Sequence, residues 1–311
     1  MAGSLITFVV RRTAAALTVL VGASLCCFLT FHVLRPDMFD GRGSFGSQLW
    51  DFLDRTFVHA DLGRSWTIGH RRVTEMVLEG LPADISLLAG GIVIGTLAGI
   101  AGGAVCAVRP KSLVARGLGL FAAVAVCAPV YWIGLVAIFL FSPDIGTLGL
   151  PFVGGQGTYK PLTADPLHWL QGLILPWLVL AAPLAAMCLR MMRKTMVDAL
   201  DADYLRTALG KGLRWRTAIR RHAVPAGASP VIALAGVTMA TVVTNAILIE
   251  RTFNIPGVLR LTTVATGSIE GKGVVDYPVL QGIVITGALM VVVASLVTDV
   301  ALAWLDPRVR T

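Results

Sequence analysis

The chain has 311 residues, of which 56% are hydrophobic and 14% charged, and its formal net charge is +8. Soluble domains average about 25% charged residues, so this composition excludes an ordinary soluble protein. The apolar residues are collected into long runs, which indicates a membrane protein. Most of the basic residues flank these runs, so the positive charge fits the positive-inside rule better than nucleic-acid binding.

Several apolar segments reach the roughly 20 residues that a membrane-spanning helix needs. The run after Arg11 and Arg12 is too long for the apolar core of a secretory signal, so we expect it to stay as the first span. The sequence therefore predicts an all-α polytopic fold with six spans, at approximately 8–34, 85–108, 117–141, 172–192, 231–249 and 281–305.

The distribution of Lys and Arg predicts the orientation of these spans. Placing the N-terminus in the cytoplasm also places there the nine basic residues between positions 190 and 230. Both termini are then cytoplasmic. We expect an N-terminal span with a long outer loop (1–84) and a five-span core (85–311) that carries a cytoplasmic loop at about 193–230. The other basic residues on the cytoplasmic side are Arg11, Arg12, Arg109, Lys111, Arg116, Arg308 and Arg310.

The spans contain features that predict close packing and bends. Gly91, Gly95, Gly99 and Gly103 follow one another at four-residue spacing, which puts them on one helix face where another helix can come close. Pro129, Pro176 and Pro183 lie inside the third and fourth spans and can kink them.

The connections outside the membrane are of two kinds. The part of the first outer loop from Arg64 to Leu81 has apolar residues at helical spacing, so we expect an amphipathic segment that leads into the second span. The loops at 142–171 and 250–280 are rich in Gly and Pro, and we expect them to be ordered only by contacts.

No catalytic or metal site is predicted. The chain lacks a phosphate-binding loop, a G-x-S-x-G elbow and any zinc-type histidine spacing, so we expect no bound cofactor or metal. The stretch from Val153 to Gly157 is similar to the signature loop of ABC ATPases, but without a Walker lysine we interpret it as a turn.

The few ionisable residues in or beside the spans have structural interpretations. We expect Asp84, Arg190 and Glu250 to lie near the interfaces, where water reaches them, and Asp299 to pair with a basic residue. The lack of charge at mid-depth disfavours a secondary transporter.

The polar segment from Arg190 to Pro230 is the most informative stretch. It predicts a short helix at 203–209 with Tyr204, Leu205, Ala208 and Leu209 on one side. Gly210 and Gly212 end this helix, and a basic amphipathic stretch runs on to Pro225. The apolar side of the short helix needs a cover, which could be the membrane interface or a groove on a soluble partner.

This segment resembles the cytoplasmic loop of ABC importer permeases, specifically those for dipeptides, oligopeptides and nickel. It departs from the general importer pattern at Arg206, where that pattern has Glu, and at His222, where it has Ile. The permeases for dipeptides, oligopeptides and nickel have their own version of the pattern, D-Y-[VL]-R-T-A-x-x-K-G-L, in which Arg is the expected residue at 206. Counting both patterns, the matching residues are Asp203, Tyr204, Leu205, Arg206, Thr207, Ala208, Lys211, Gly212, Leu213 and Pro225.

The resemblance covers essentially the whole chain. The long first loop is similar to that of the B-type permease subunit. A departure occurs at 35–37, Arg-Pro-Asp, where the family more often has Pro-Gly-Asp. Further matches occur at 11–12, 61–65, 81–82, Glu250, Phe253, Pro256, Gly257, Asp276, Tyr277, Pro278, 281–282, Asp299, 306–308 and Arg310.

The resemblance implies a type I permease fold and a set of partners. The chain would pair with a second, similar permease. Two ATP-binding subunits, or one fused ATPase, would hold ATP and Mg on the cytoplasmic side, and an extracytoplasmic binding protein would dock on the other side. This chain would have no ATPase site of its own.

The resemblance also implies roles for particular residues. Residues 200–213 would form a coupling helix in a groove of the ATPase, with Tyr204 and Leu205 as apolar anchors and Gly212 allowing close approach, so that Gly212→Asp would uncouple transport. Candidate contacts of the binding protein are Phe253, Pro256, Gly257, Asp276, Tyr277 and Pro278.

Short peptides are the substrate that the resemblance favours, and nickel, haem or another small solute is the alternative. From the residues alone, a secondary transporter, a membrane scaffold and a membrane enzyme stay open as other classes. None of them explains the pattern at 203–213.

Overall fold

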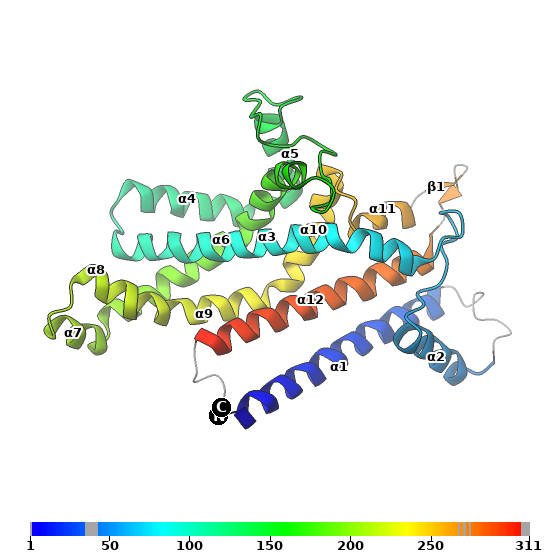
Figure 1. Ribbon diagram of the computed structural model, residues 1–311, viewed down its shortest axis with the longest axis horizontal. Helices are drawn as coiled ribbons and strands as arrows, with labels where there is room; N and C mark the ends of the chain where they lie inside the picture. The colour runs from blue at the N-terminus through cyan, green and yellow to red at the C-terminus, as the bar shows by residue number, and fades with distance from the viewer. Residues whose placement is uncertain (1, 35–42, 267, 270–271, 274, 306–311) are drawn as a thin grey trace. The chain divides into compact units, whose positions relative to one another are not determined.

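The computed structural model describes residues 2–34, 43–266, 268–269, 272–273 and 275–305 (Figure 1). Between its loops, this part of the chain forms helices and two short antiparallel strands, β1 (Ser268–Ile269) and β2 (Lys272–Gly273). The family-like stretches at 35–37 and 306–308, and Arg310, lie outside the described residues.

Four helices are long and apolar enough to cross a membrane: α1 (Ala2–Leu34), α3 (Val73–Val108), α6 (Pro166–Asp201) and α12 (Tyr277–Leu305). They contain the predicted first, second, fourth and sixth spans. The structure extends α3 and α6 well beyond the predicted ends, because the polar residues that flank the apolar runs continue the helix.

The predicted third and fifth spans are each two helices that meet at a sharp bend. α4 (Leu113–Cys127) and α5 (Val130–Phe141) meet at 118°, and α9 (Val224–Val237) and α10 (Met239–Phe253) at 58°. The span predicted over 117–141 is therefore bent at Pro129, the proline that was expected to be able to kink it. Ala128 is extended because the ring of Pro129 disfavours the helical conformation of the residue before it. The count of six spans holds if each bent pair is one span.

Short helices fill the connections. In the first loop, α2 (Phe45–Leu53) is followed by the π-helical turn η2 (Asp54–Val58). After α6 come α7 (Asp203–Gly210), α8 (Trp215–Ala218) and a second π-helical turn, η3 (Ile219–Ala223). After α10 come η4 (Leu259–Leu261) and α11 (Thr262–Ala265).

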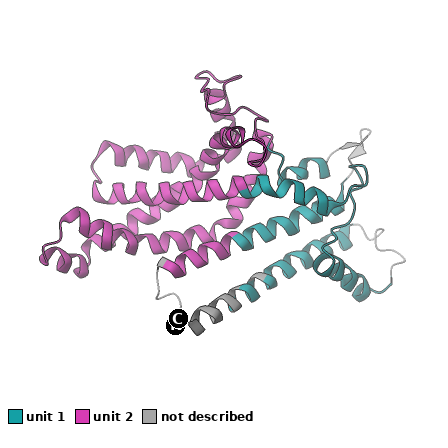
Figure 2. Ribbon diagram, viewed as in Figure 1, with its two compact units in different colours: residues 1–85, 255–293 teal, residues 86–254, 294–311 magenta. Residues whose placement is uncertain are grey.

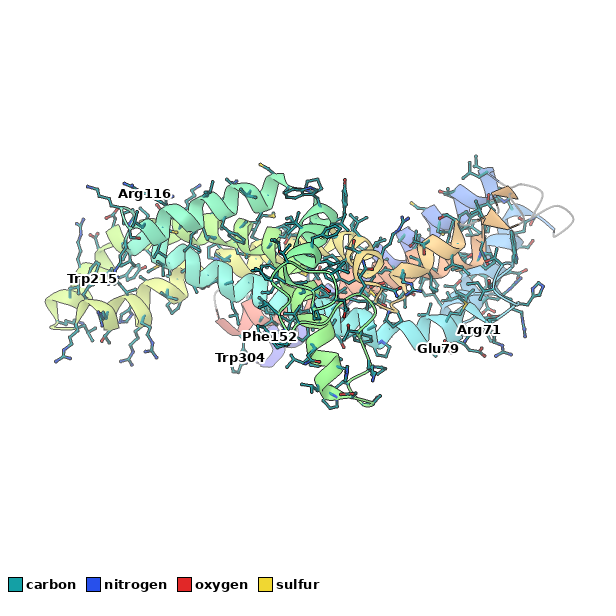
Figure 3. All side chains as sticks on the ribbon, turned by 90° about the horizontal axis from the view of Figure 1, so that it is seen from above. Arg71, Glu79, Arg116, Phe152, Trp215 and Trp304 are labelled. Atoms are coloured by element: carbon teal, nitrogen blue, oxygen red, sulfur yellow. The ribbon has the colours of Figure 1, made fainter. Side chains whose placement is uncertain are left out.

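The amphipathic segment predicted at 64–81 is only partly helical. From Val73 onward it is the first part of α3, but 64–72 is irregular, since Gly69 and His70 have positive φ. Arg71 and Glu79 join the two parts by an ion pair of 2.6 Å (Figure 3). Both side chains are exposed, so this pair contributes little to stability.

The chain forms two compact units, 1–85 with 255–293 (unit 1) and 86–254 with 294–311 (unit 2) (Figure 2). Unit 1 gathers 255–293 onto the N-terminal part through buried carboxylates. Asp84 accepts a hydrogen bond from the Val258 N–H at 2.8 Å, and Asp276 binds the loop at Ser65. The sequence-based division at residue 84 separates these segments, and as a division into domains it stays a prediction.

Helix α6 carries much of the core of unit 2. Its side chains at Leu173, Ala186, Cys188, Met192 and Met196 are completely buried. The glycine face of α3 lies directly against α6. A Cβ on Gly91 would come within 2.6 Å of Leu180, one on Gly95 within 3.1 Å of Ala181, one on Gly99 within 2.3 Å of Cys188, and one on Gly103 within 2.5 Å of Met192.

Candidate functional site

Helix α7 is a separate short helix at one end of unit 2 (Figures 1 and 2). It contacts α6, α8 and η3. Leu205 is 1% exposed and Ala208 8%, so the apolar side of α7 is covered by its own chain. The expectation that Leu205 serves as an anchor for a partner is therefore wrong, because this side chain holds α7 in place.

The other side of α7 is bare. Tyr204 is 46% exposed, and Asp203, Arg206, Thr207 and Lys211 are also exposed. Arg206 and Asp203 form an ion pair of 3.7 Å, but their side chains are 72% and 97% exposed. Such a pair is weak, so both groups stay available to a partner.

Gly212 ends α7 by a backbone requirement. Its φ is +87°, a left-handed conformation that glycine adopts without strain. The Gly212 N–H donates to Leu209 O at 2.9 Å and the Leu213 N–H to Ala208 O at 3.3 Å. These two bonds form a Schellman motif. No atom of the described chain lies within 4 Å of a Cβ placed on Gly212, so the close approach to a partner stays a prediction.

The basic stretch after α7 is helical and continues into α9. Ala218 and Ala223 are completely buried, whereas Trp215, Arg216, Arg220 and Arg221 are exposed (Trp215 is labelled in Figure 3). The π-helical turn η3 precedes Pro225, which has no N–H and would clash with the preceding turn of a regular α-helix. The wider turn accommodates the proline without breaking the helix.

The residues proposed to contact a binding protein are largely internal. Phe253 is 2% exposed, Gly257 and Asp276 are buried, Tyr277 and Pro278 are half-buried, and Pro256 is exposed. Their contact with a partner stays a prediction.

Asp276 is the central polar residue of the outer part of unit 1. Its Oδ2 accepts hydrogen bonds from Ser65 Oγ at 2.6 Å, from the Trp66 N–H at 2.9 Å, and from Thr67 N–H and Oγ1 at 3.0 and 2.8 Å. Its Oδ1 accepts from the Val279 N–H at 3.4 Å and caps α12. Burial raises the pKa of this carboxyl, but the hydrogen bonds from Ser65, Thr67 and Val279 outweigh it, so the pKa lies below its ordinary value.

Asp84 and Glu250 are also completely buried, so the expectation that water reaches them is wrong. Close backbone packing explains this for Asp84. A Cβ on Gly80, one turn earlier, would lie 2.6 Å from the Val258 nitrogen. Arg190 is exposed as expected, and its guanidinium donates to Ala122 O at 3.3 Å.

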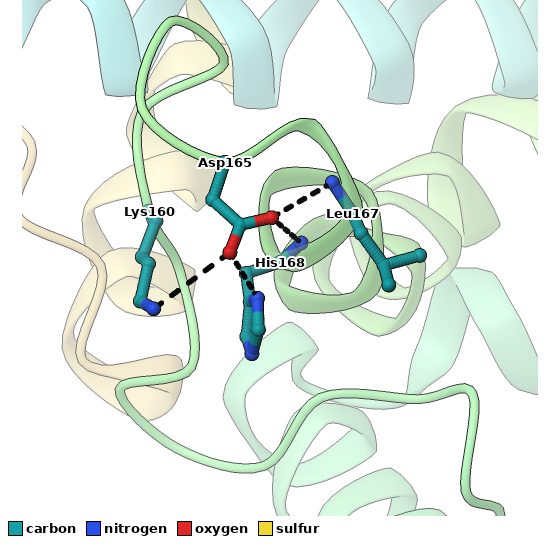
Figure 4. A network of polar contacts seen from close by, with 4 residues as sticks. All are labelled: Lys160, Asp165, Leu167 and His168. Atoms are coloured by element: carbon teal, nitrogen blue, oxygen red, sulfur yellow. Dashed lines mark hydrogen bonds and ion pairs between the residues drawn. The ribbon is translucent and has the colours of Figure 1, made fainter.

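The 142–171 loop is ordered by contacts within unit 2. The Gly154 N–H donates to Gln171 O and the Gly157 N–H to Phe253 O, which accounts for the turn at 153–157. At its end Asp165 caps α6 by accepting from the N–H groups of Leu167 and His168 (Figure 4). The hydrogen bond from the His168 N–H, with the His168 ring and Lys160, lowers the pKa of Asp165.

Comparison with known proteins identifies the chain's family. Residues 91–311 match the family described as binding-protein-dependent transport system inner membrane component. This match covers well over half of the sequence. The chain belongs to this family.

Relatives of this permease agree with the assignment. It is 32% identical over 265 residues to a protein of Brucella abortus (strain 2308) named as a peptide transport system permease, covering 85% of this chain and 79% of that one. It is 30% identical to a protein of Sinorhizobium fredii named as a peptide ABC transporter permease, over 76% of this chain and 72% of that one. It is 25% identical to the oligopeptide transport system permease protein AppB of Bacillus subtilis (strain 168), covering 97% and 99%.

The permease is therefore a multi-pass protein of the bacterial inner membrane and a subunit of an ABC transporter. As a permease subunit it has no ATPase site of its own. The secondary transporter, the scaffold and the membrane enzyme are no longer candidate classes.

Proposed function

We propose that this permease forms half of the translocation pathway of an ATP-driven importer of short peptides, and that α7 couples it to an ATPase. The observation that carries the proposal is the two-sided structure of α7. Leu205 and Ala208 fix the helix to its own chain, while the side chains of Tyr204 and Arg206 are exposed.

This arrangement suits the transmission of movement. A helix that is fixed on one side by buried side chains moves with α6 and η3, which it contacts. A partner that holds the exposed side of α7 can therefore displace the two membrane helices that continue from these contacts, α6 and α9. The nucleotide-driven closing of an ATPase would bias such a two-state movement.

The complete importer contains a second permease, two ATP-binding subunits or one fused ATPase, and an extracytoplasmic binding protein. ATP and Mg bind to the ATPase partners. Peptides are the proposed substrate because the relatives from Brucella, Sinorhizobium and Bacillus are named as peptide or oligopeptide permeases. The N-terminus and α7 lie on the cytoplasmic side, as the basic residues at 190–230 predict.

The test begins with mild detergent extraction, affinity purification of the permease and mass spectrometry of its partners. The proposal expects a second permease and ATP-binding subunits. A chain that is isolated alone, or only with copies of itself, in several detergents would refute it.

Reconstitution then tests the coupling. In proteoliposomes with the binding protein and ATP, Tyr204→Ala with Arg206→Ala should lower uptake of a labelled dipeptide and stimulated ATPase activity at least tenfold. The matched control is Arg190→Ala, an exposed arginine of the same segment. Unchanged uptake in the double variant would contradict the role of α7.

A further inference from the structure

Unit 1 contains a cleft of about 510 Å³ that the coupling function does not use. It lies between the end of α1, α2 with η2, the loop at 61–70 and the start of α12. Its volume falls within the range of about 300–1,000 Å³ that is usual for small-molecule sites. All of these segments belong to the same compact unit.

Aromatic rings form much of the wall of this cleft. Phe28 lies 5.1 Å from Phe52, between ring centroids, Phe31 lies 5.1 Å from Tyr277, and Trp66 lies 5.8 Å from Tyr277. Trp66 is 41% exposed, so part of its ring is free to contact a ligand. A wall of this kind binds apolar and aromatic side chains.

Three polar groups at the cleft have unused bonding capacity. Thr56 is 8% exposed, and its hydroxyl has no hydrogen-bond partner among the described residues. The side chains of Asp51 and Arg55 are exposed at the cleft, and neither has an ion-pair or hydrogen-bond partner in the described part of the chain. A buried hydroxyl without a partner costs stability, so it indicates a group that a ligand can satisfy.

The other charged groups at the cleft are already engaged. Asp61 accepts a hydrogen bond from the Gly63 N–H at 3.0 Å, and the Arg64 guanidinium donates to His70 O at 3.4 Å. Among the described residues, the charged side chains at the cleft that have no hydrogen-bond or ion-pair partner are thus one carboxylate, Asp51, and one guanidinium, Arg55. Arg55 and Thr56 lie in the π-helical turn η2, a local geometry frequent at functional sites.

The spacing of these two charges matches a short peptide. Asp51 and Arg55 are four residues apart along the helix, which places their Cβ atoms about 6 Å apart. The termini of an extended dipeptide are at most about 7 Å apart, since each residue spans about 3.5 Å. A peptide ammonium can therefore reach Asp51 while its carboxylate reaches Arg55.

We propose that this cleft binds a short zwitterionic peptide, with its ammonium at Asp51, its carboxylate at Arg55 and an apolar side chain against the aromatic wall. This proposal rests on the peptide-import function and assigns a second, outer position to the substrate. Arg55 is the better carboxylate ligand of the two cleft arginines because its guanidinium is uncommitted and can bind in bidentate fashion.

The test measures binding of radiolabelled Ala-Phe to the complete transporter in nanodiscs, without the binding protein. Asp51→Asn and Arg55→Gln should each weaken binding at least tenfold, as expected for a lost charge-assisted bond. Arg72→Gln and Glu75→Gln are the matched controls. Arg72 directly precedes α3 and Glu75 lies in its first turn, and both side chains are exposed but do not line the cleft. Both controls should bind like the wild type.

Blocked peptides identify which terminus each residue binds. C-amidated Ala-Phe should bind the wild type at least tenfold more weakly than Ala-Phe, but should lose nothing further in Arg55→Gln. N-acetyl Ala-Phe should behave in the same way with Asp51→Asn. If blocking a terminus lowers the affinity by the same factor in the variant as in the wild type, the assignment of the termini is overturned.

Thr56→Val provides a variant that keeps the shape of the side chain. It removes the unpartnered hydroxyl, so the protein should fold at least as well as the wild type and bind Ala-Phe about threefold more weakly. If Asp51→Asn and Arg55→Gln bind like the controls, the cleft is not a peptide site. If they weaken docking of the binding protein while peptide binding is unchanged, the cleft holds a loop of that protein, and the proposal is equally overturned.

The same material separates the two proposals. Wild-type proteoliposomes that import no peptide would refute the peptide-import function. Import that proceeds normally in Asp51→Asn and Arg55→Gln would refute the cleft site alone.

Discussion

The coupling segment of unit 2 and the outer loop of unit 1 are held by opposite means. Helix α7 is fixed by the apolar side chains of Leu205 and Ala208 and by the backbone motif at Gly212. The loop at 65–67 is fixed by a single buried carboxylate, Asp276, which accepts four hydrogen bonds from it. The apolar contacts leave the polar side chains of α7 available to a partner. The Asp276 carboxylate, in contrast, is bound within the protein, so the stability of the 65–67 loop depends on pH.

The largest expected effect comes from Asp276→Ala. It leaves the buried hydroxyl of Ser65 and the partly buried donors of Trp66 and Thr67 without their acceptor, which costs about 3 kcal/mol. Limited proteolysis should show earlier cleavage of the outer loop, while cleavage near α7 is unchanged. A protease pattern identical to that of the wild type would show that Asp276 does not hold the outer loop in place.

Leu205→Ala should destabilise the coupling segment by about 2 kcal/mol, the lower end for loss of a fully buried leucine side chain. Hydrogen exchange should rise in α7 and leave the 65–67 loop unchanged. Tyr204→Ala is the control, because that side chain is half exposed and its removal should leave exchange in α7 almost unaltered. Equal exchange in the two variants would contradict the inward role of Leu205.

Gly212→Ala should cost about 1 kcal/mol, since φ is +87° and no neighbour obstructs a Cβ. The loss is therefore conformational, and it is measured as a lower unfolding temperature of the purified complex. Gly210→Ala is the matched control, because Gly210 lies in the last turn of α7 without a positive φ. Gly212→Asp should add an uncoupling of ATPase activity from uptake, and normal uptake would argue against a partner at this position.

The smallest effect concerns pH. The folded pKa of Asp276 lies below its ordinary value, so its ionised form stabilises the loop above a pH of about 4. This stabilisation is lost as the pH falls through the folded pKa. Proteolysis of the outer loop should therefore increase below pH 4 in the wild type and depend less on pH in Asp276→Asn, whereas equal pH dependence would contradict the account.

The sequence predicts the fold well where hydrophobic runs decide it. The long apolar runs locate α1, α3, α6 and α12 because length and composition suffice for a span. The 118° angle between α4 and α5 could not be predicted, since Pro129 permits a bend but neighbouring helices determine its size.

The site is less predictable because it depends on which neighbour covers a side chain. Tyr204 and Leu205 are adjacent apolar residues, and periodicity alone does not show that only Leu205 faces its own chain. The role of Asp276 depends on partners about 210 residues away in sequence. Its position just before Tyr277 and Pro278 is a helix-capping signal that could have suggested part of this role.

The most direct test of the central claim is site-specific photo-crosslinking in the native membrane. A photoreactive phenylalanine analogue replaces Tyr204, which is 46% exposed, or, as a control, Tyr131 of α5, which is 48% exposed. The account predicts a crosslink from position 204 to an ATP-binding subunit that changes in yield with ATP, and none to that subunit from position 131. Crosslinks from position 204 only to lipid or to the permease itself would contradict the assignment of α7 as the coupling helix.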